Sequence, residues 1–481
     1  MKIVIFFFLC LSCNVLLAQA PQKFYMRFGG NGYDVGYDVK QTLDNGYIIT
    51  GSTSSFGQGN TDMYLIKLDS VGHKKFETSF GNYNNEIGKS VVQLLDSSYV
   101  VVGYTNSIGF GGYDIFLVKT DKNGNLLWQK TIGGTDWDFA YSMQTTSDGG
   151  FIIAGTTYSY GYGNADGYVI KTDASGNTIW TKTYGGANDD EFKSVIQTAD
   201  GGYALTGYTK SHNDVNGDSW LFKLNTSGDS VKSFSYNFGK FDSYNDIKEL
   251  STGEYLIGGA VTFTNTQNMD GIFAKINTSG QVLLQVFEGQ AGSDEQIYKV
   301  NVSNSSFGTY TFLCNSHENG SAFQNQIKLL LIDAGGGYVN GGSIGSSFDD
   351  ECYSFCLTKE SSKGYAAIGY TDSYNSILSD FFFIKYDSLL SIGTNITSLK
   401  ETNLIKKVNV FPNPFSEKIY FENIESIDIY TLQGDMVYYN SKINSNSLDL
   451  GFLSAGTYII SVTNKSHYKF SQKLIKINTD D

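Results

Sequence analysis

The chain has 481 residues and a formal net charge of −14, and aromatic residues make up 15% of it. Because its only arginine is Arg27 and it lacks a clustered basic surface, nucleic acid is excluded as a partner. Its 54 glycines and 3 prolines, with many aromatic residues, favour β-strands joined by tight turns.

The N-terminus has the pattern of a secretory signal peptide. A positively charged start precedes an apolar run over residues 3–17, and the small residues Ala18 and Ala20 follow. We predict a signal peptide over residues 1–18, with cleavage after Ala20 as the alternative. A lipid anchor on Cys13 is disfavoured, because the residue three positions before it is not leucine. No later segment has the roughly 20 continuous apolar residues of a transmembrane helix.

The middle of the chain is a repeat. Its marker is a glycine inside an apolar run, and successive copies are 52 residues apart at Gly51, Gly103, Gly155, Gly207 and Gly259. Degenerate copies follow at Cys314 and Gly369, which makes seven units. A second marker moves in phase: an acidic residue, an apolar strand and then lysine, as in DMYLIKLD at residues 62–69.

A complete unit is predicted to contain four short strands. In the fourth unit they cover residues 193–198, 203–209, 219–225 and 231–239, with Asp-Gly and Ser-Gly at the turns. Four strands in a repeat of about 40 to 55 residues are typical of a propeller blade. We therefore predict an all-β fold with a seven-bladed β-propeller over residues 21–393.

Ring closure is predicted from the two ends of the repeat region. The last unit lacks its own fourth strand, whereas KFYMRFGG at residues 23–30 matches the fourth-strand pattern LLWQKTIGG of residues 126–134. We expect residues 23–30 to supply the outer strand of the last blade, because this removes an exposed sheet edge.

The C-terminal region has a different pattern after a polar linker at residues 394–407. Alternating apolar residues predict a small antiparallel β-sandwich. Four motifs occur in order: VFPNPF at 410–415, IDIYTLQGDMVYY at 427–439, LSAGTYIISV at 453–462 and KFSQKLIKI at 469–477.

Residues 408–478, with these motifs, resemble the type-A C-terminal sorting domain of the type IX secretion system. The resemblance implies recognition by the secretion machinery and a secreted or cell-surface location. It assigns the sorting motif to five positions: Pro412, Asn413, Pro414, Gly456 and Tyr458.

Acidic residues precede the first strand of each unit and form the first candidate site. In a propeller they would lie near the mouth of the central channel, where carboxylates can hold Ca²⁺ or a cationic ligand. The candidates are Asp136, Asp138, Asp189, Asp190, Glu191, Asp294, Glu295, Asp349, Asp350 and Glu351. Because they recur in every unit, we favour the alternative that they cap turns and strand ends.

Aromatic residues in the loops between second and third strands form the second candidate site. They are Phe56, Phe110, Tyr113, Tyr158, Tyr160 and Tyr162, and Trp137 is expected on the same rim. Exposed rings beside carboxylates suit sugar stacking or protein contact. The alternative is that they pack on the glycine-rich loop backbone. The repeated lysine of the third strand is interpreted as structural, paired with an acidic residue.

No catalytic residue is assigned. The four histidines are scattered, and no zinc-protease motif, nucleophile elbow, P-loop or dinucleotide fingerprint occurs. The motif DKNGNLLWQK at residues 121–130 resembles the repeats of quinone-dependent propeller dehydrogenases. The metal and quinone ligands of those enzymes have no counterpart in this sequence. We therefore interpret the motif as a turn that the blades of both kinds of protein share. We predict a monomeric binding or adhesion protein with a glycan or protein ligand and no cofactor except Ca²⁺. The alternative is a secreted carbohydrate-active enzyme with a carboxylate pair on the rim.

Overall fold

The computed structural model describes most of the chain in two compact units, Met1–Thr394 and Asn395–Asp481. The described residues are 24–212, 216–263, 268–289, 292–303, 309–318, 325–344, 350–359, 364–372, 379–386, 390, 415–421, 424–431, 436–440, 443, 445–464 and 469–477. Within these ranges the structure is all-β, and no helix there is long and apolar enough to cross a membrane. The predicted signal peptide and the predicted linker lie outside the described residues.

In the first unit, the described residues form seven four-stranded antiparallel sheets, numbered here in chain order. The first sheet contains β2 (Asp34–Gln41), β3 (Tyr47–Thr53), β4 (Asp62–Leu68) and β5 (Lys74–Phe80). The second contains β6 (Glu86–Gln93), β7 (Tyr99–Thr105), β8 (Asp114–Thr120) and β9 (Leu126–Ile132). The third contains β10 (Asp138–Thr145), β11 (Phe151–Thr157), β12 (Asp166–Thr172) and β13 (Thr178–Tyr184).

The fourth sheet contains β14 (Asp190–Gln197), β15 (Tyr203–Thr209), β16 (Asp218–Leu224) and β17 (Ser230–Tyr236). The fifth contains β18 (Phe241–Glu249), β19 (Tyr255–Thr262), β20 (Met269–Ile276) and β21 (Val282–Glu288). The sixth contains β22 (Ser293–Val302), β23 (Tyr310–Glu318), β24 (Asn325–Ile332) and β25 (Tyr338–Ile344).

The seventh sheet joins the two ends of the repeat region. It contains β26 (Asp350–Leu357), β27 (Tyr365–Thr371), β28 (Asp380–Tyr386) and β1 (Phe24–Phe28). The strand β1 is antiparallel to β28, with Arg27 opposite Phe382. The Arg27 guanidinium also contacts the Asp380 carboxylate at 3.1 Å. The outer edge of this sheet is therefore supplied by residues far away in the sequence.

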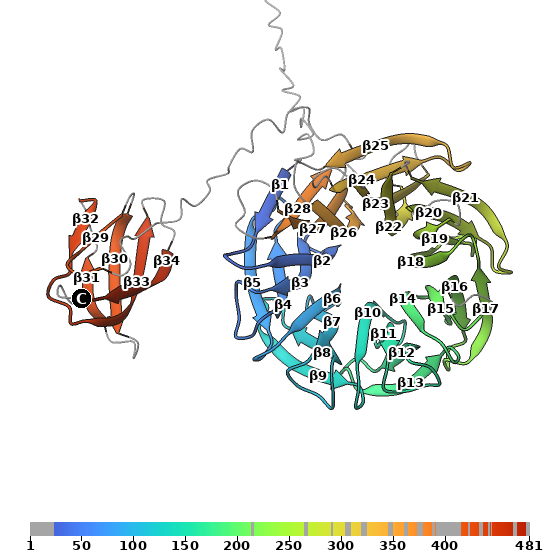
Figure 1. The fold of residues 1–481 in the computed structure, drawn as a ribbon, viewed down its shortest axis with the longest axis horizontal. Coiled ribbons are helices and arrows are strands. Elements are labelled where there is room, and N and C mark those ends of the chain that lie inside the picture. Colours follow the sequence, from blue (N-terminus) through green and yellow to red (C-terminus); the bar gives the residue numbers. More distant parts are fainter. Residues whose placement is uncertain are drawn as a thin grey trace, which may run out of the picture. The chain divides into compact units, whose positions relative to one another are not determined.

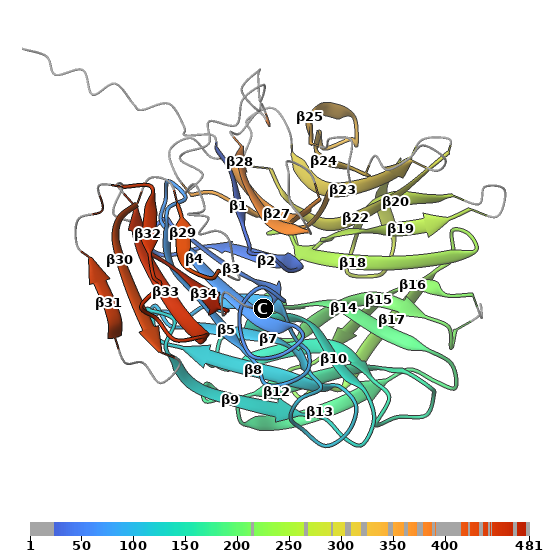
Figure 2. The same cartoon turned by 60° about the vertical axis from the view of Figure 1, so that its left-hand side comes forward.

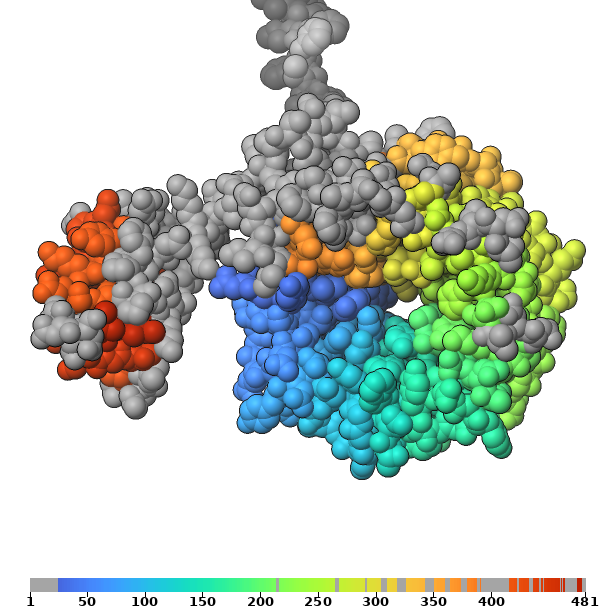
Figure 3. Space-filling view, in the orientation of Figure 1, coloured from blue at the N-terminus to red at the C-terminus, as the bar shows by residue number. Residues whose placement is uncertain are grey.

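The sheets are arranged around a common axis (Figure 1). The first strand of each sheet lies innermost, as β2, β10 and β18 show in both ribbon views (Figure 2). In the space-filling view the sheets follow one another around the ring in chain order (Figure 3). Apolar residues fill the junctions between neighbouring sheets: Ile48 of the first sheet clusters with Val101 and Phe116 of the second. The middle strands β3 and β4 are buried along their whole length, and their buried residues include Thr50 and Lys67 as well as apolar side chains.

In the second and third sheets, the turn between the third and fourth strands contacts the preceding sheet. Gly124, with φ +86°, lies against the Phe76 ring, and Gly176, with φ +73°, lies against Trp128. The preceding Asp121 closes its turn by accepting the Asn123 and Asn125 N–H groups at 2.8 and 2.9 Å. The Asp-x-x-Gly…Trp motif is thus a turn followed by an aromatic ring. That ring packs against the turn glycine of the following sheet.

The repeat-marking glycine makes a close backbone contact. A Cβ atom on Gly51 would lie 1.9 Å from the Val35 carbonyl oxygen, and one on Gly155 would lie 1.8 Å from that of Phe139. Both carbonyls lie just before a β-bulge in the innermost strand, at Tyr37 in β2 and at Tyr141 in β10. The marker glycine therefore reports a bulge on the neighbouring strand.

The second unit contains two sheets among its described residues. One pairs β29 (Lys418–Tyr420) with β32 (Ser447–Asp449). The other has the order β31 (Met436–Asn440), β30 (Ile424–Thr431), β33 (Gly456–Asn464) and β34 (Lys469–Lys476). Phe415, Ile419, Ile427 and Leu474 belong to one buried apolar cluster, which gives this unit its own core.

Three cysteines of the first unit, Cys314, Cys352 and Cys356, are buried and free. Burial raises the pKa of all three thiols. Packing, and not a disulfide among these residues, stabilises the ring.

Candidate functional site

An acidic residue at the start of the innermost strand holds the loops around it in the third and fourth sheets. Asp138 is fully buried and accepts the Gly134 N–H and the Ser159 hydroxyl, both at 2.7 Å. Asp190 repeats this arrangement with the Gly186 N–H at 2.8 Å and the Ser211 hydroxyl at 2.6 Å. These hydrogen bonds fit the interpretation that the repeated acids stabilise loops.

Each of these acids also lies beside a second buried carboxylate, which begins the third strand of the preceding sheet. Asp114 and Asp138 both approach the Cα of Gly133, where a Cβ atom would lie 2.1 and 2.7 Å from their oxygens. Burial raises the pKa of Asp114, and the charge of Asp138 adds to this. In the seventh sheet, burial together with the charge of Asp34 raises the pKa of Asp380 to about 6, against the opposing effect of Arg27.

The described part of the chain holds no group of three or more His, Cys, Asp or Glu side chains that could hold a metal ion. The repeated carboxylates occur in pairs inside the junctions between sheets. Their backbone and hydroxyl partners already satisfy several of the oxygens. The predicted Ca²⁺ site stays a prediction.

The remaining predicted acids of the sixth and seventh sheets have different surroundings. Glu295 is buried and accepts the Ser293 and Ser316 hydroxyls at 2.6 and 2.7 Å. Asp294 is half-buried and accepts the Met269 N–H at 2.7 Å. Asp350 is buried at the start of β26, whereas Asp349 lies outside the described residues. Most of these side chains therefore serve the local fold.

Glu351 differs because it contacts two titratable side chains. His317 Nε2 lies 2.9 Å from its carboxylate, and the Tyr353 hydroxyl donates to it at 2.6 Å. The Glu351 hydrogen bond raises the pKa of His317. Although burial opposes it, the hydrogen bonds and charge of His317 leave the pKa of Glu351 below its ordinary value.

Exposed polar and aromatic residues gather on the third and fourth sheets. They lie on what we call the loop rim, the edge formed by the second-to-third-strand loops and the connections between sheets. Trp137 is 50% exposed and Tyr160 is 47% exposed, with the Tyr160 hydroxyl donating to the Gly133 carbonyl at 2.9 Å. Asp136 is exposed, and Asp189 pairs with Lys210 at 2.9 Å.

Trp137 belongs to a larger aromatic group, the rim aromatic cluster. Its members come from the second and third sheets and their loops: Tyr104, Tyr113, Trp137, Phe139, Tyr141 and Tyr158. Phe139 is at its centre, with ring centroids 4.9 Å from Tyr104 and 6.3 Å from Trp137. Edge-to-face contacts predominate, as between Trp137 and Tyr158 at 6.0 Å. The rings support one another, and Trp137 and Tyr158 stay accessible.

Charged side chains of the fourth sheet lie next to this cluster. Glu191 pairs with Lys193, whose ammonium lies 5.1 Å from the centre of the Tyr141 ring. Burial and the charge of Glu191 raise the pKa of Tyr141 and of Tyr158, so both phenols are neutral hydrogen-bond donors at physiological pH. Flat rings beside ion pairs and phenol donors can bind a sugar face or a peptide.

Sequence reasoning missed Tyr104, Phe139 and Tyr141. Tyr104 directly follows the marker Gly103, and Phe139 and Tyr141 are one and three positions after the rim acid Asp138. These fixed offsets from the repeat markers are the only sequence signal that could have identified the three residues. The rings come from different strands and sheets, so no local motif contains them together.

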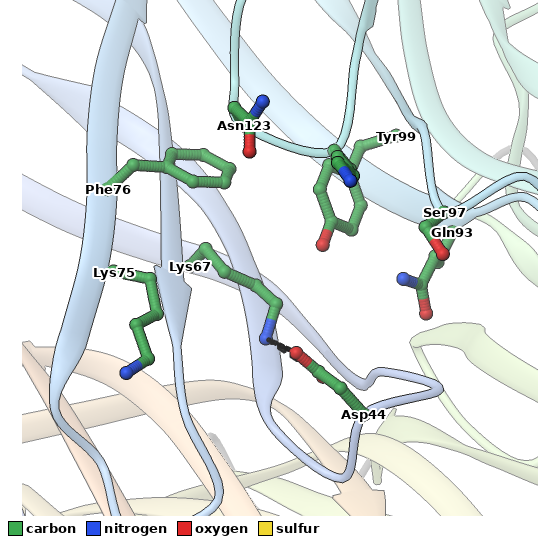
Figure 4. Close-up of a pocket in the computed structure, with 9 residues that line it drawn as sticks. Asp44, Lys67, Lys75, Phe76, Gln93, Ser97, Tyr99 and Asn123 are labelled. Atoms are coloured by element: carbon green, nitrogen blue, oxygen red, sulfur yellow. Dashed lines mark hydrogen bonds and ion pairs between the residues drawn. The ribbon is translucent and has the colours of Figure 1, made fainter.

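A hollow of about 380 Å³ lies elsewhere, at the hairpin turns between the first and second sheets (Figure 4). Its lining includes Phe76, Tyr99 and the ion pair of Lys67 with Asp44 at 3.0 Å. The third sheet repeats this pair in Lys171 and Asp148, at 2.9 Å. The repeated lysine therefore ties a third strand to a hairpin turn, as the structural interpretation expects, and the hollow is remote from the rim aromatic cluster.

The predicted sorting motif is described in part. Gly456 begins β33, and the buried Tyr458 donates its hydroxyl to the Ser454 carbonyl at 2.9 Å. Pro412, Asn413 and Pro414 lie outside the described residues.

Comparison with protein families identifies this C-terminal unit. Residues 409–478 match the family described as the secretion system C-terminal sorting domain. The chain thus carries a type IX sorting domain at its C-terminus, which indicates a secreted or cell-surface protein and an interaction with the secretion machinery.

The rest of the chain has more distant relatives. The regulatory protein FlaEY of Caulobacter vibrioides is 28% identical over 289 residues, which cover 52% of this chain and 28% of that protein. The match therefore spans less than a third of this relative. Among solved structures, the extracellular domain of a hybrid two-component-system protein from B. thetaiotaomicron has a TM-score of 0.44 at 12% identity, covering 95% of this chain and 59% of that chain. The WD40 domain of Neurospora crassa Pan2 has a TM-score of 0.44 at 10% identity, covering 76% of this chain and 96% of that chain.

Proposed function

We propose that the mature protein binds a glycan or protein ligand outside the cell through the rim aromatic cluster. The observation that carries the proposal is a group of aromatic rings packed edge to face, with accessible members beside ion pairs. Trp137 is the centre of the proposed contact, and Asp136, Asp189, Glu191 and Tyr160 surround it. The sorting domain explains how this surface reaches a ligand outside the cell.

The proposal includes a closed seven-bladed β-propeller followed by a C-terminal β-sandwich. In it, residues 1–18 are the signal peptide, 21–393 the propeller, 394–407 the linker and 408–478 the sorting domain. The pairing of β1 with β28 supports closure, because it joins the ends of the ring in one sheet. A monomer suffices for this arrangement, since each sheet is covered by its neighbours in the same chain.

Binding explains the acidic residues better than glycoside hydrolysis does. A glycosidase needs two carboxyl groups about 5 to 10 Å apart facing a substrate. The fully buried Asp138 and Asp190 instead bind loop N–H and hydroxyl groups, and the same arrangement recurs in successive sheets. Because the same arrangement recurs in successive sheets, these acids are better explained as structural residues than as a catalytic pair.

A glycan array probed with the mature protein, with and without calcium, tests the proposal. We expect Trp137→Ala and Tyr158→Ala each to lower binding at least tenfold, because both remove an accessible ring. Tyr338→Ala is the matched control, since Tyr338 is 67% exposed on the outer strand β25. Equal loss in the control, or unchanged binding in both rim variants, would contradict the assignment. Hydrolysis of an arrayed glycan would support the enzyme instead.

A further inference from the structure

A β-bulge occurs at one equivalent position in all seven innermost strands. In β2 the register shifts between Gly36 and Asp38, and in β6 it shifts between Gly88 and Ser90. The residue left out of the ladder is the third after the acid at or near the start of the strand, which is Asp242 in β18 and Glu295 in β22. These seven residues, which we call the axial ring, are Tyr37, Lys89, Tyr141, Lys193, Asn245, Tyr298 and Tyr353.

The side chains of the axial ring meet across the junctions between sheets. All seven are half-buried. The Lys89 ammonium lies 3.4 Å from the centre of the Tyr37 ring, and Tyr37 is 5.2 Å from Tyr353, ring centre to ring centre. Tyr353 is in turn 5.4 Å from Tyr298. Because a bulge turns a side chain out of the regular ladder, it can aim one residue per sheet at the axis.

Lys89 differs from three other lysines near the axis. Lys40 pairs with Asp38 at 2.8 Å, Lys299 with Asp246 at 3.3 Å, and Lys193 with Glu191. Among the described residues Lys89 has no hydrogen bond or ion pair, and its partner is the Tyr37 ring face. A partly desolvated ammonium without a counter-charge is unfavourable.

The electrostatics agree with this geometry. Burial lowers the pKa of Lys89 to about 7, and the charge of Lys193 contributes. Lys193 is on the fourth sheet and Lys89 on the second, so the two ammonium groups act on each other across the axis. An anion near Lys89 would supply the missing counter-charge.

We propose that the axial ring binds the anionic group of an acidic sugar, with the Lys89 ammonium as its anchor. The phenols of Tyr37 and Tyr141 supply hydroxyl groups for the sugar oxygens. Tyr141 belongs to both the axial ring and the rim aromatic cluster, so a glycan on the cluster can reach Lys89. The inference rests on the proposed function and names its ligand class. A carboxylate and a sulfate ester meet the same requirement.

Isothermal titration of the mature protein tests this inference. The probes are tetragalacturonate, a sulfated tetrasaccharide, neutral cellotetraose and inorganic sulfate. We expect at least tenfold tighter binding of an acidic tetrasaccharide than of cellotetraose, and the two acidic probes distinguish carboxylate from sulfate. Binding should weaken as salt is added, because the anchor is a charge.

The variants separate the anchor from the rest of the surface. Lys89→Met should lose at least tenfold in affinity for the acidic sugar and keep its affinity for cellotetraose. Lys89→Arg should retain most of the acidic-sugar binding, and the exposed Lys122→Met is the matched control. Thermal melts establish that each variant is folded, and Lys89→Arg keeps the test valid if Lys89→Met is not.

Four results would overturn the inference. These are equal affinity for acidic and neutral sugars, unchanged acidic-sugar binding in Lys89→Met, equally tight binding of inorganic sulfate alone, and no sugar binding at all. In the first two, a loss of binding in Trp137→Ala would leave the proposed function intact. The fourth result, no sugar binding at all, would also exclude a glycan as the ligand in the proposed function.

Discussion

The innermost strands carry two repeated positions, an acid near the start and a bulge residue three positions later. The two positions differ in what stays the same from sheet to sheet, residue type or backbone geometry. The first position carries an acid in nearly every sheet, and Asp138 and Asp190 make matching hydrogen bonds. The bulge position has one backbone geometry but carries tyrosine, lysine or asparagine. Where a repeat keeps both residue and contacts, the role is in the scaffold. Where it keeps the backbone and varies the side chain, the position is free to serve a ligand.

The strongest test of this contrast is a substitution that removes the bulge geometry. Gly155→Ala would place a Cβ atom 1.8 Å from the Phe139 carbonyl oxygen, so β10 must move. We expect the free energy of unfolding to fall by about 3 kcal/mol or more, measured by urea denaturation. Gly149→Ala is the control, because its Cβ meets nothing within 4 Å and its φ of +84° costs only about 1 kcal/mol. Equal effects would argue against the close contact.

Removal of a repeated acid should have the next largest effect. Asp138→Ala leaves the Gly134 N–H and the Ser159 hydroxyl without their acceptor, and we expect a loss of about 2–4 kcal/mol. Relief of the repulsion with Asp114 reduces this loss but does not cancel it. Asp136→Ala, at an exposed neighbouring position, should be almost neutral when both variants are compared by urea denaturation. If Asp138→Ala leaves the stability unchanged, Asp138 has no structural role and would instead be available for a ligand.

Lys89→Met should act in the opposite direction and stabilise the protein by about 1–2 kcal/mol below pH 7. The folded state holds the pKa of Lys89 at about 7, below its ordinary value of 10.5. Between these values the unfolded chain binds the extra proton, so the stability of the wild type rises with pH. The advantage of the variant should therefore shrink from pH 7 towards pH 10. An advantage that does not vary with pH would show that Lys89 carries no such cost.

The smallest effect is expected at an exposed ion pair of the loop rim. Asp189→Asn breaks the contact with Lys210, and both side chains are about one-third exposed. We expect less than about 0.5 kcal/mol in stability. A much larger loss by chemical denaturation would mean that the rim pairs belong with the scaffold.

The sequence predicted the all-β fold well because the repeat marks the places where backbones touch. Gly51 and the five other marker glycines lie against a carbonyl of the neighbouring strand, and turn glycines such as Gly124 and Gly176 lie against rings of the preceding sheet. Such contacts restrict residue identity, so they appear in the sequence as a fixed period. The seven blades and the C-terminal sandwich remain predictions of the same pattern.

The candidate site was harder to predict because the residues proposed to contact a ligand vary from unit to unit. The acids are conspicuous in the sequence because they recur, and recurrence reflects their role in holding loops. Tyr104, Phe139 and Tyr141 form one cluster only because neighbouring strands and sheets bring them together. No local sequence pattern predicts a contact between residues so far apart in the chain.

By itself, the sequence determined the strand pattern, the repeat and the sorting domain, since each depends on contacts within a unit or on motifs in order. Only the tertiary structure decided which acids are buried, which aromatic rings meet and that no described carboxylate pairs with Lys89. Those properties arise at the junctions between sheets and across the axis. There, the environment of a side chain is set by residues one or more repeats away.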